Sequence, residues 1–444
     1  MTSNLAVWLG TIYFLIIRFV AGSPTSQVAL PLKDHYKPYN FGLQSSEATS
    51  QLVERCGPST VDVVCINHYT SVLPGDFFRA PINNSNRPAD QPSYSQTSGI
   101  NETNSSFDLI SSASFILWEP VRALSLLGKH PTHEFIVQLP EAFHEAPVYV
   151  PETNELYFSQ MSLDVLAQPV IHLNDSPPTL SYKVASPPIY SAQGGIYHKG
   201  LIYFTTGGGN ASYEARPGIV TLNATTGKSE VLLNNYFGWY LNSPDDIAID
   251  SNGDIWFTDN SYSYGNGVNT RAPVLPIQTY RFRPSTGLLT VVEDTLEQPN
   301  GICFSPDGQT LYLSDTGPLA GEVNQQKPPG VSNYQLLNHR TIYAFDVIEK
   351  TAGKPYLANK RPIYMTQNWL PDGLKASREG YILTGTGTSV DVLDAEGELL
   401  MSIPTNFTAV NINWAGKDLE ELWIVGVGGV SRVTGLNLHG QTLT

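Results

Sequence analysis

One short motif recurs along most of the chain and constrains the fold more than any other feature of the sequence. Each copy follows a turn with Gly or Asn and consists of three mostly apolar, β-prone residues followed by small or polar ones. The copies read LYFSQ at 156, IYFTT at 202, IWFTD at 255, LYLSD at 311, YILTG at 381 and LWIVG at 422. Hairpin-type strands that repeat about every 40 to 50 residues are typical of β-propeller blades. The six copies therefore predict an all-β, six-bladed β-propeller.

The composition agrees with this fold class. Of 444 residues, 37 are Gly and 32 are Pro, while only 15% are charged, which favours short strands and turns over charged helices. We expect the segment HEFIVQLP at 133–140 to pair with strands from the end of the chain and so to leave no open sheet edge. The longest interval between motifs contains a Pro- and Gly-rich insertion at 317–339, which predicts a long loop.

The N-terminus predicts export. Residues 5–20 form an apolar run followed by small residues, which is typical of a secretory signal peptide at 1–22; an uncleaved anchor is the alternative, because Arg18 lies late in the run. Seven Asn-x-Ser/Thr sites are compatible with a glycosylated, secreted, extracellular protein that leaves the membrane after signal cleavage. These sites are Asn83, Asn101, Asn104, Asn174, Asn210, Asn223 and Asn406.

The remaining chain divides into two parts. Residues 23–115 are interpreted as an N-terminal extension and a glycosylated linker, because 84–115 hold few large apolar side chains, and 116–444 as the propeller domain. In an oxidising compartment Cys56 and Cys65 can close a loop with a disulfide. Cys303 lies in the apolar run GICF, and we expect it to be buried and inert.

A polar side chain stands ten to twelve residues before the centre of each motif. The six are Glu145, Gln193, Asp245, Asn300, Asp372 and Asn411. The innermost strand of every blade lines the centre of a propeller, so these side chains should converge there. Their carboxylate and amide oxygens favour Ca²⁺, or another hard divalent ion such as Mg²⁺ or Mn²⁺, over Zn²⁺. The alternative for any single position is a β-turn cap, which explains six registered positions poorly.

The net charge of −15 agrees with such a site. It would repel nucleic acid and anionic membranes, and it suits a cation or a neutral substrate whose acidic product must leave.

Three segments carry a resemblance to a known family. HEAPVYVPETNELYFS, QPNGICFSPDGQTLYLSD and LPDGLKASREGYI resemble, in the same order, segments of the senescence marker protein/gluconolactonase family, and more closely its secreted fungal lactonohydrolase branch. The resemblance spans about residues 116–444. It implies a six-bladed propeller that hydrolyses sugar-type (aldono) or related lactones around one divalent metal.

The resemblance also implies roles for the residues of the ring. The metal ligands fall on Glu145, Asn300 and Asp372, and a further Asn used by relatives near the metal and substrate falls on Asp245, which is a departure. Asp372, or Asp245 beside it, is the expected base, and Asp245, Gln193 and Asn411 are expected to contact substrate. Asp246 should instead turn away from the centre and bond backbone amides.

Two other readings stay open. One is a phosphotriesterase-like hydrolase on the same metal propeller, and the other is a non-enzymatic, strictosidine synthase-like binding propeller. The chain has no Gly-x-Ser-x-Gly motif, which argues against a serine esterase. His144 is interpreted as a packing residue between blades and His198 as a solvated turn residue.

Overall fold

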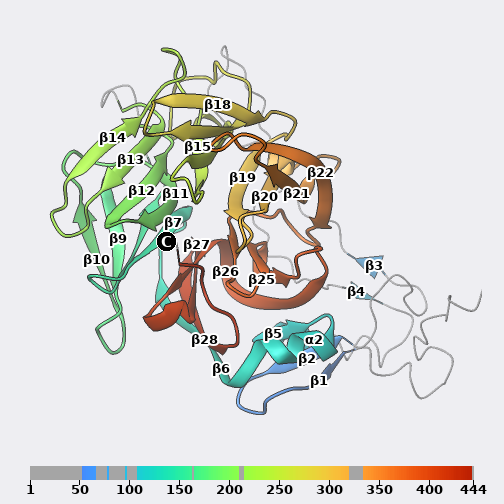
Figure 1. Cartoon of the computed structure of the whole chain (residues 1–444). Helices are drawn as coiled ribbons and strands as arrows, with labels where there is room; N and C mark the ends of the chain where they lie inside the picture. The colour runs from blue at the N-terminus through green and yellow to red at the C-terminus, as the bar shows by residue number, and fades with distance from the viewer. Residues whose placement is uncertain are drawn as a thin grey trace, which may run out of the picture.

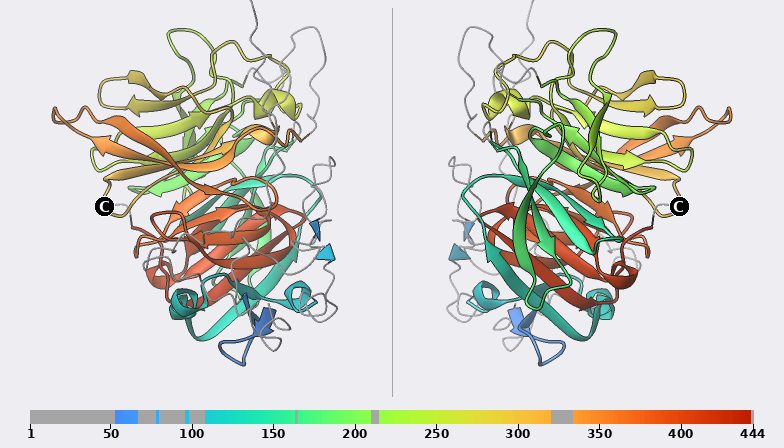
Figure 2. Two further views of the ribbon diagram at one scale, coloured as in Figure 1. Left: turned by 90° about the vertical axis from the view of Figure 1, so that its right-hand side faces the viewer. Right: turned by 90° about the vertical axis from the view of Figure 1, so that its left-hand side faces the viewer.

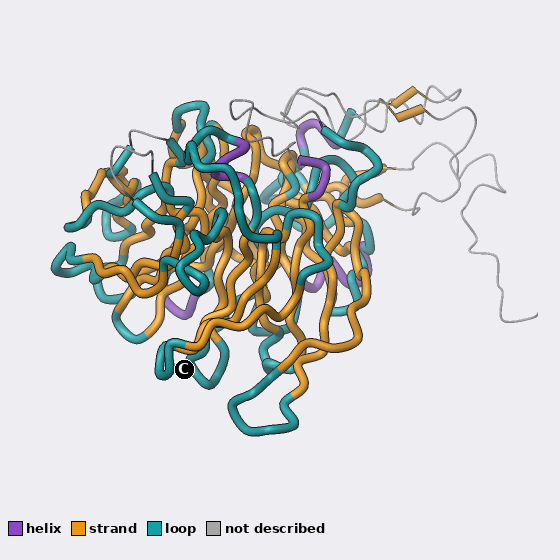
Figure 3. Tube along the Cα trace, turned by 90° about the horizontal axis from the view of Figure 1, so that it is seen from above, coloured by secondary structure: helices purple, strands orange, loops and turns teal. Residues whose placement is uncertain are grey.

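The computed structural model describes residues 53–66, 78–79, 96–97, 108–162, 165–209, 215–319 and 334–442. Strands dominate these residues, and the helices among them are short turns (Figure 3), which confirms the predicted all-β class. The turns are η2 (Ile110–Ser112), α2 (Pro120–Ala123), η3 (Leu124–Leu126), α3 (Tyr262–Gly265), η4 (Gly317–Leu319) and η5 (Lys417–Leu419). The predicted signal peptide, most of the predicted linker and residues 320–333 of the insertion lie outside the described residues.

Four sheets of four strands follow one another along the chain (Figure 1). The first contains β7 (His144–Val150), β8 (Glu155–Gln160), β9 (Ala167–His172) and β10 (Thr179–Val184). The second contains β11 (Ala192–His198), β12 (Leu201–Thr206), β13 (Gly218–Leu222) and β14 (Ser229–Leu233). The third contains β15 (Pro244–Ile249), β16 (Ile255–Asp259), β17 (Gln278–Arg283) and β18 (Leu288–Glu293). The fourth contains β19 (Pro299–Phe304), β20 (Thr310–Thr316), β21 (Arg340–Ile348) and β22 (Tyr356–Met365). The second strand of each sheet carries one copy of the recurring motif.

A fifth sheet of ten strands joins the two ends of the described chain. Its C-terminal strands are β23 (Leu374–Ala376), β24 (Ile382–Gly385), β25 (Gly387–Leu393), β26 (Leu399–Ala415), β27 (Glu421–Val427) and β28 (Gly429–Leu436). Its N-terminal strands are β1 (Val53–Arg55), β2 (Val63–Ile66), β5 (Phe115–Leu117) and β6 (Leu127–Gln138). A separate pair, β3 (Phe78–Arg79) and β4 (Gln96–Thr97), lies outside this sheet.

The N-terminal strands attach at two places. β6 pairs antiparallel with β28, which confirms the expected pairing of 133–140 with the end of the chain. β5 pairs with the first half of β26, and β2 and β1 extend the sheet from β5. Cys56 and Cys65 form the expected disulfide at this edge. The extension therefore packs on the body through residues 53–66, whose Val63 and Cys65 join its apolar core.

Six strands lie at the centre of the molecule and contact one another in series. β7 contacts β11, and the series continues through β15, β19, β23 and β26 back to β7. We call these the inner strands. Apolar clusters fill the space between neighbouring sheets, and the central motif residues Tyr157, Trp256 and Trp423 are fully buried in them. Burial of each such side chain stabilises the fold by roughly 1.5–3 kcal/mol, so the recurring motif supplies the packing between sheets.

No helix within the described ranges has both the length and the apolar character needed to cross a membrane.

Candidate metal and catalytic site

Five of the six predicted site residues lie where the inner strands bulge, and the sixth, Asp372, stands just before β23. The pairing register with the second strand shifts between Glu145 and Val148, between Pro244 and Ile247, and between Pro299 and Ile302. Two further inner strands shift between Ala192 and Gly194 and between Ala409 and Asn411. A β-bulge bends the strand and redirects the side chain at that point. One bulge per strand therefore breaks the regular alternation of side-chain directions at five residues, which are Glu145, Gln193, Asp245, Asn300 and Asn411.

Hydroxyl groups of the recurring motif fasten these bulges to one another. Thr258 Oγ1 accepts from the amide of Asp246 at 3.0 Å and donates to the carbonyl of Asn300 in the next sheet at 2.7 Å. Ser314 Oγ accepts from Gly301 N at 2.7 Å and donates to the carbonyl of Asp372 at 2.9 Å. Thr205 in the second sheet likewise accepts from Gly194 N and donates to the Asp245 carbonyl. Each hydroxyl thus sets the position of one site residue relative to the next.

Glycines after the site residues allow the close approach of neighbouring inner strands. A Cβ on Gly301 would lie 2.4 Å from the Asp372 carbonyl oxygen, and a Cβ on Gly373 would lie 2.3 Å from Cγ of Asn411. Both distances are shorter than real Cβ contacts. A side chain at either position would therefore push Asp372 or Asn411 away from the centre.

Three carboxylates and two amides gather at the centre, and we call Glu145, Asp245, Asn300, Asp372 and Asn411 the acidic cluster. All five are at most 6% exposed. Asn411 Nδ2 donates to Glu145 Oε2 at 3.0 Å, and Asn260 Nδ2 donates to Asp245 Oδ2.

The three carboxyl groups influence one another's protonation. Burial, and then the charges of Asp372 and Asp245, raise the pKa of Glu145 well above its usual value. Burial and the charge of Asp245 raise the pKa of Asp372 in the same way, against a hydrogen bond from Asn300 that lowers it. Burial raises the pKa of Asp245 to about 7. The cluster is therefore costly to ionise without a cation, because like charges and low dielectric both disfavour the carboxylate forms.

One atom of the cluster is left without a bond. Asp372 Oδ1 is buried and has no hydrogen-bond partner among the described residues. Leaving a buried carboxylate oxygen unpaired is unfavourable, so such an atom needs a ligand or a proton. A hard divalent cation fits this donor set, because Glu145, Asn300 and Asp372 offer oxygen ligands and their charges repel one another.

Gln193 and Asp246 lie beside the cluster. The amide of Gln193 is engaged with Ser243 and, at 2.6 Å, with Ser263 of α3. Asp246 is 1% exposed and accepts from its neighbour Ile247 N at 2.9 Å and from Ile302 N at 3.3 Å. These bonds confirm that Asp246 turns to backbone amides. Its second oxygen also lies 3.4 Å from Lys375 Nζ, a partner that the sequence did not reveal.

The two histidines singled out from the sequence are both buried. His144 packs edge-on against Phe158, with ring centroids 6.1 Å apart, and its Nδ1 lies 3.1 Å from the Gly426 carbonyl oxygen, as expected of a packing residue. The interpretation of His198 as a solvated turn residue is wrong. It ends β11, is 7% exposed, and its pKa is lowered by burial. The hairpin turn begins one residue later than the sequence indicated.

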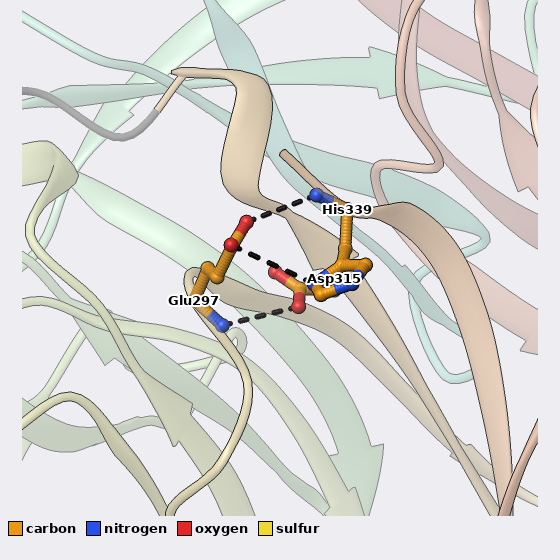
Figure 4. A group of neighbouring side chains, drawn as sticks. All are labelled: Glu297, Asp315 and His339. Carbon is orange, nitrogen blue, oxygen red and sulfur yellow. Dashed lines mark hydrogen bonds and ion pairs between the residues drawn. The ribbon is translucent and has the colours of Figure 1, made fainter. Parts of the chain in front are cut away.

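A second group of possible metal ligands lies on loops and strand ends of the fourth sheet. Ligand atoms of Glu297, Asp315 and His339 all lie within 4.8 Å of one another (Figure 4). Asp315, however, already accepts from the amides of Gln298 and Glu297 at 2.9 and 3.0 Å. In the third sheet, Asp259 accepts from the amides of Ser243 and Asn242 in the same way. The sequence around that motif contains no histidine. In both sheets the aspartate binds two amides of the loop before the first strand, and we call this arrangement a loop clamp. The loop clamp explains the second group, so the acidic cluster is the better metal site.

The motif hydroxyls Thr205, Thr258 and Ser314 were not predicted from the sequence. A signal was present, because Ser or Thr occupies the fourth position in five of the six motif copies. Tyr262 of α3 was missed as well. Its hydroxyl donates to the Thr316 carbonyl at 2.9 Å. Burial raises its pKa, and the charges of Asp372 and Asp245 raise it further, so it lies near the cluster.

Comparisons with known proteins define the family. The model of the SMP-30/gluconolactonase/LRE-like region matches residues 143–323, which contain four of the six motif-associated polar residues. The chain is 45% identical over 396 residues to the lactonohydrolase oryL of Aspergillus oryzae, covering 88% of this chain and 89% of that protein. The chain therefore belongs to the SMP-30/gluconolactonase/LRE-like family.

Two further relatives agree with this assignment. The lactonohydrolase oryH of Aspergillus oryzae is 37% identical over 456 residues, covering 89% of this chain and 95% of that protein. Among solved structures, a gluconolactonase from Xanthomonas campestris superimposes with a TM-score of 0.56 at 25% identity, covering 71% of this chain and 92% of that one.

Proposed function

We propose that this protein is a divalent-metal-dependent lactonase that opens the ester ring of sugar-type (aldono) or related lactones. The observation that carries the proposal is the buried acidic cluster, in which Asp372 Oδ1 has no partner among the described residues. Similarity to two lactonohydrolases over most of the chain supports the substrate class. A neutral lactone also suits a site whose carboxylates would repel an anionic substrate.

The proposed scaffold is a six-bladed β-propeller. The four four-stranded sheets supply four blades. The ten-stranded sheet would supply two. In one, β23, β24 and β25 pair in series and β25 pairs with the first half of β26. In the other, the second half of β26 pairs with β27, and β28 and β6 follow. The single long strand β26 then runs from the outside of one blade into the inside of the next.

Glu145, Asn300 and Asp372 would hold the metal, with Ca²⁺ as the first candidate and Mg²⁺ or Mn²⁺ as alternatives. Bound by these residues, such an ion would supply Lewis acidity toward a lactone carbonyl and would lower the pKa of a bound water. The protein's own part is to take and hold a proton. Asp245, whose pKa is raised to about 7, suits a general base at neutral pH, and Asp372 is the other candidate. Asn411 and Gln193 would orient substrate hydroxyls.

We also propose that the protein is secreted, with cleavage after residue 22, an extension and linker to residue 115, and the catalytic domain from 116. The disulfide between Cys56 and Cys65 supports an oxidising compartment. Asn174 and Asn406 are exposed, as glycan acceptors must be.

A small panel of lactones tests the function. We expect purified protein to hydrolyse at least one aldono-, pantoyl or aromatic lactone, to lose at least 99% of that rate in chelator, and to regain it with Ca²⁺ or another hard ion. Full turnover by metal-free protein would disprove the metal dependence. Fluorophosphate hydrolysis above lactone hydrolysis would favour the phosphotriesterase-like alternative. A protein that is purified without stoichiometric metal and stays inactive on both classes after Ca²⁺ is added would favour the binding propeller.

A further inference from the structure

A cavity of about 300 Å³ lies at the opposite ends of the inner strands from the acidic cluster. The cluster residues stand near the starts of these strands, whereas the cavity is lined by residues near their ends, such as His198, Ile249 and Phe304. Gln441, close to the end of the chain, also borders it and donates to the carbonyl of Phe304 at 3.1 Å. Figure 2 shows the C-terminus on one face of the molecule and α3, which lies beside the cluster, on the opposite face. The cavity is therefore separate from the candidate catalytic site.

Most of the cavity wall is apolar. Ile247, Ile249 and Ile302 line one side, and Ala376, Trp414 and Leu419 line another. A pocket of roughly 300–1,000 Å³ with apolar walls and a few convergent polar groups is the usual form of a small-molecule site. A volume near the lower bound fits a ligand of about ten non-hydrogen atoms, if each takes about the 30 Å³ share of a water molecule.

Lys375 supplies a charged donor to the cavity wall. Lys375 Nζ donates to the Leu374 carbonyl at 3.0 Å and lies 3.4 Å from Asp246 Oδ2. An ammonium has three donors, and the distance to Asp246 exceeds the roughly 2.7–2.9 Å of a close charge-assisted bond, so Lys375 has capacity for a further acceptor.

We propose that this cavity binds a small monocarboxylate with an apolar body, held by Lys375 at its carboxylate and by the isoleucines and Trp414 along its chain. The carboxylate supplies an acceptor for the donor that Lys375 has left, and the apolar body matches the wall. The ligand is either the hydroxy acid released when a related lactone with an apolar chain is opened, or an unrelated fatty or aromatic acid. The site does not depend on the proposed lactonase activity, because none of the acidic cluster lines the cavity.

Calorimetric titration of the full chain with octanoate and with octanamide tests the carboxylate requirement without any variant. We expect one octanoate per chain and at least tenfold weaker binding of octanamide, which has the same length and no charge. Titration with 6-hydroxyhexanoate separates the two sources, because tighter binding than octanoate indicates a reaction product and weaker binding indicates an unrelated apolar acid. Absence of saturable octanoate binding, or equal affinity for octanamide, overturns the proposal.

Two variants and a chelator locate the site. Lys375→Met should reduce octanoate affinity to the level of octanamide, whereas Lys375→Arg should retain the preference for the carboxylate. Because Lys375→Met leaves Asp246 without its cation, the double variant Lys375→Met/Asp246→Asn repeats the test with both charges removed. Octanoate binding should survive chelator, since a carboxylate bound at a metal would not. Binding that disappears in chelator and persists in Lys375→Met places the ligand at the acidic cluster and disproves the second site.

Discussion

Asp245 and Asp246 are adjacent in the chain, yet their carboxylates face different surroundings. Asp245 accepts from Asn260 and contributes to the raised pKa of both Glu145 and Asp372. Asp246 is used by backbone amides and by Lys375. The bulge between Pro244 and Ile247 separates the two directions. A role in chemistry and a role in folding are therefore assigned to neighbouring residues.

We expect Asp245→Asn to lower kcat/KM for a lactone at least tenfold while the melting temperature stays equal or rises, because the variant removes a buried carboxylate that is costly to ionise. Asp246→Asn is the matched comparison. It should lower the free energy of unfolding by about 1–3 kcal/mol, because Lys375 and two amides lose a charged acceptor, and it should change the rate less. Rate measurements and thermal melts of both variants decide this. An Asp245→Asn enzyme with unchanged rate, selectivity and metal affinity would show that Asp245 is a turn cap.

The positions of the site residues could be predicted from the sequence, but the hydrogen bonds and ion pairs that hold them in place could not. Glu145, Asn300 and Asp372 stand at a fixed offset from a repeated motif, so a local pattern revealed them. The hydroxyl of Thr258 has its essential partner, the carbonyl of Asn300, in the next sheet. Such a contact depends on how two sheets pack, which a local pattern does not contain. Lys375 was missed for the same reason, because its carboxylate partner lies on another inner strand.

At the scale of strands, the motif hydroxyls should couple neighbouring sheets. Thr258→Val removes the acceptor of Asp246 N and the donor to the Asn300 carbonyl, and we expect it to cost about 1–3 kcal/mol of unfolding free energy and to weaken metal binding. Thr384→Val is a matched control, because Thr384 is also fully buried at the fourth motif position but donates to the adjacent Gly385 carbonyl at a long 3.4 Å. Chemical denaturation and metal titration measure both effects. Equal losses in the two variants would remove the coupling role.

The N-terminal strands should depend on their disulfide. Cys56 and Cys65 join the ends of β1 and β2, which reach the body through β5. Replacing both cysteines by Ser should cost about 2–4 kcal/mol, at the lower end because the loop is short. Cys303→Ser is the control, since Cys303 is buried, its pKa is raised to about 12 by burial, and the bridge stays intact. Thermal melts report the difference, and loss of activity in Cys303→Ser beyond a modest stability cost would contradict the inert role of this thiol.

At the scale of the whole molecule, the closing strand was predictable and the added edge strands were not. Residues 133–140 were expected to pair with the end of the chain so that no sheet edge stays open, and β6 does so by pairing with β28. β1, β2 and β5 are short, and their anchor on the body is the first half of β26, far away in sequence. Short apolar runs have many possible partners, and only the packed body selects one.

Metal and pH should act together on the stability of the whole chain. Carboxyl groups with raised pKa values keep their protons in the folded state after the unfolded chain has lost them, so unfolding releases protons between about pH 4 and pH 7 and the unfolding free energy falls as pH rises. Asp245, with a pKa of about 7, contributes to this in the metal-free protein, as do Glu145 and Asp372, whose pKa values burial and neighbouring carboxylates also raise. A bound cation reverses the effect, because its ligands must be ionised.

We therefore expect the gain in melting temperature from Ca²⁺ over chelator to grow from pH 5 to pH 8. The difference between the melting temperatures in Ca²⁺ and in chelator at one pH cancels the contribution of other buried acids. Asp259 is one of them, because its pKa is also about 7 but it lies in a loop clamp. Thermal melts in Ca²⁺ and in chelator across this range provide the measurement, and Asp372→Asn should abolish most of the gain because it removes one ligand and one repelling charge. A gain that is independent of pH, or that persists in Asp372→Asn, would place the stabilising ion outside the acidic cluster, and Asp315→Asn would then test the loop clamp as its site.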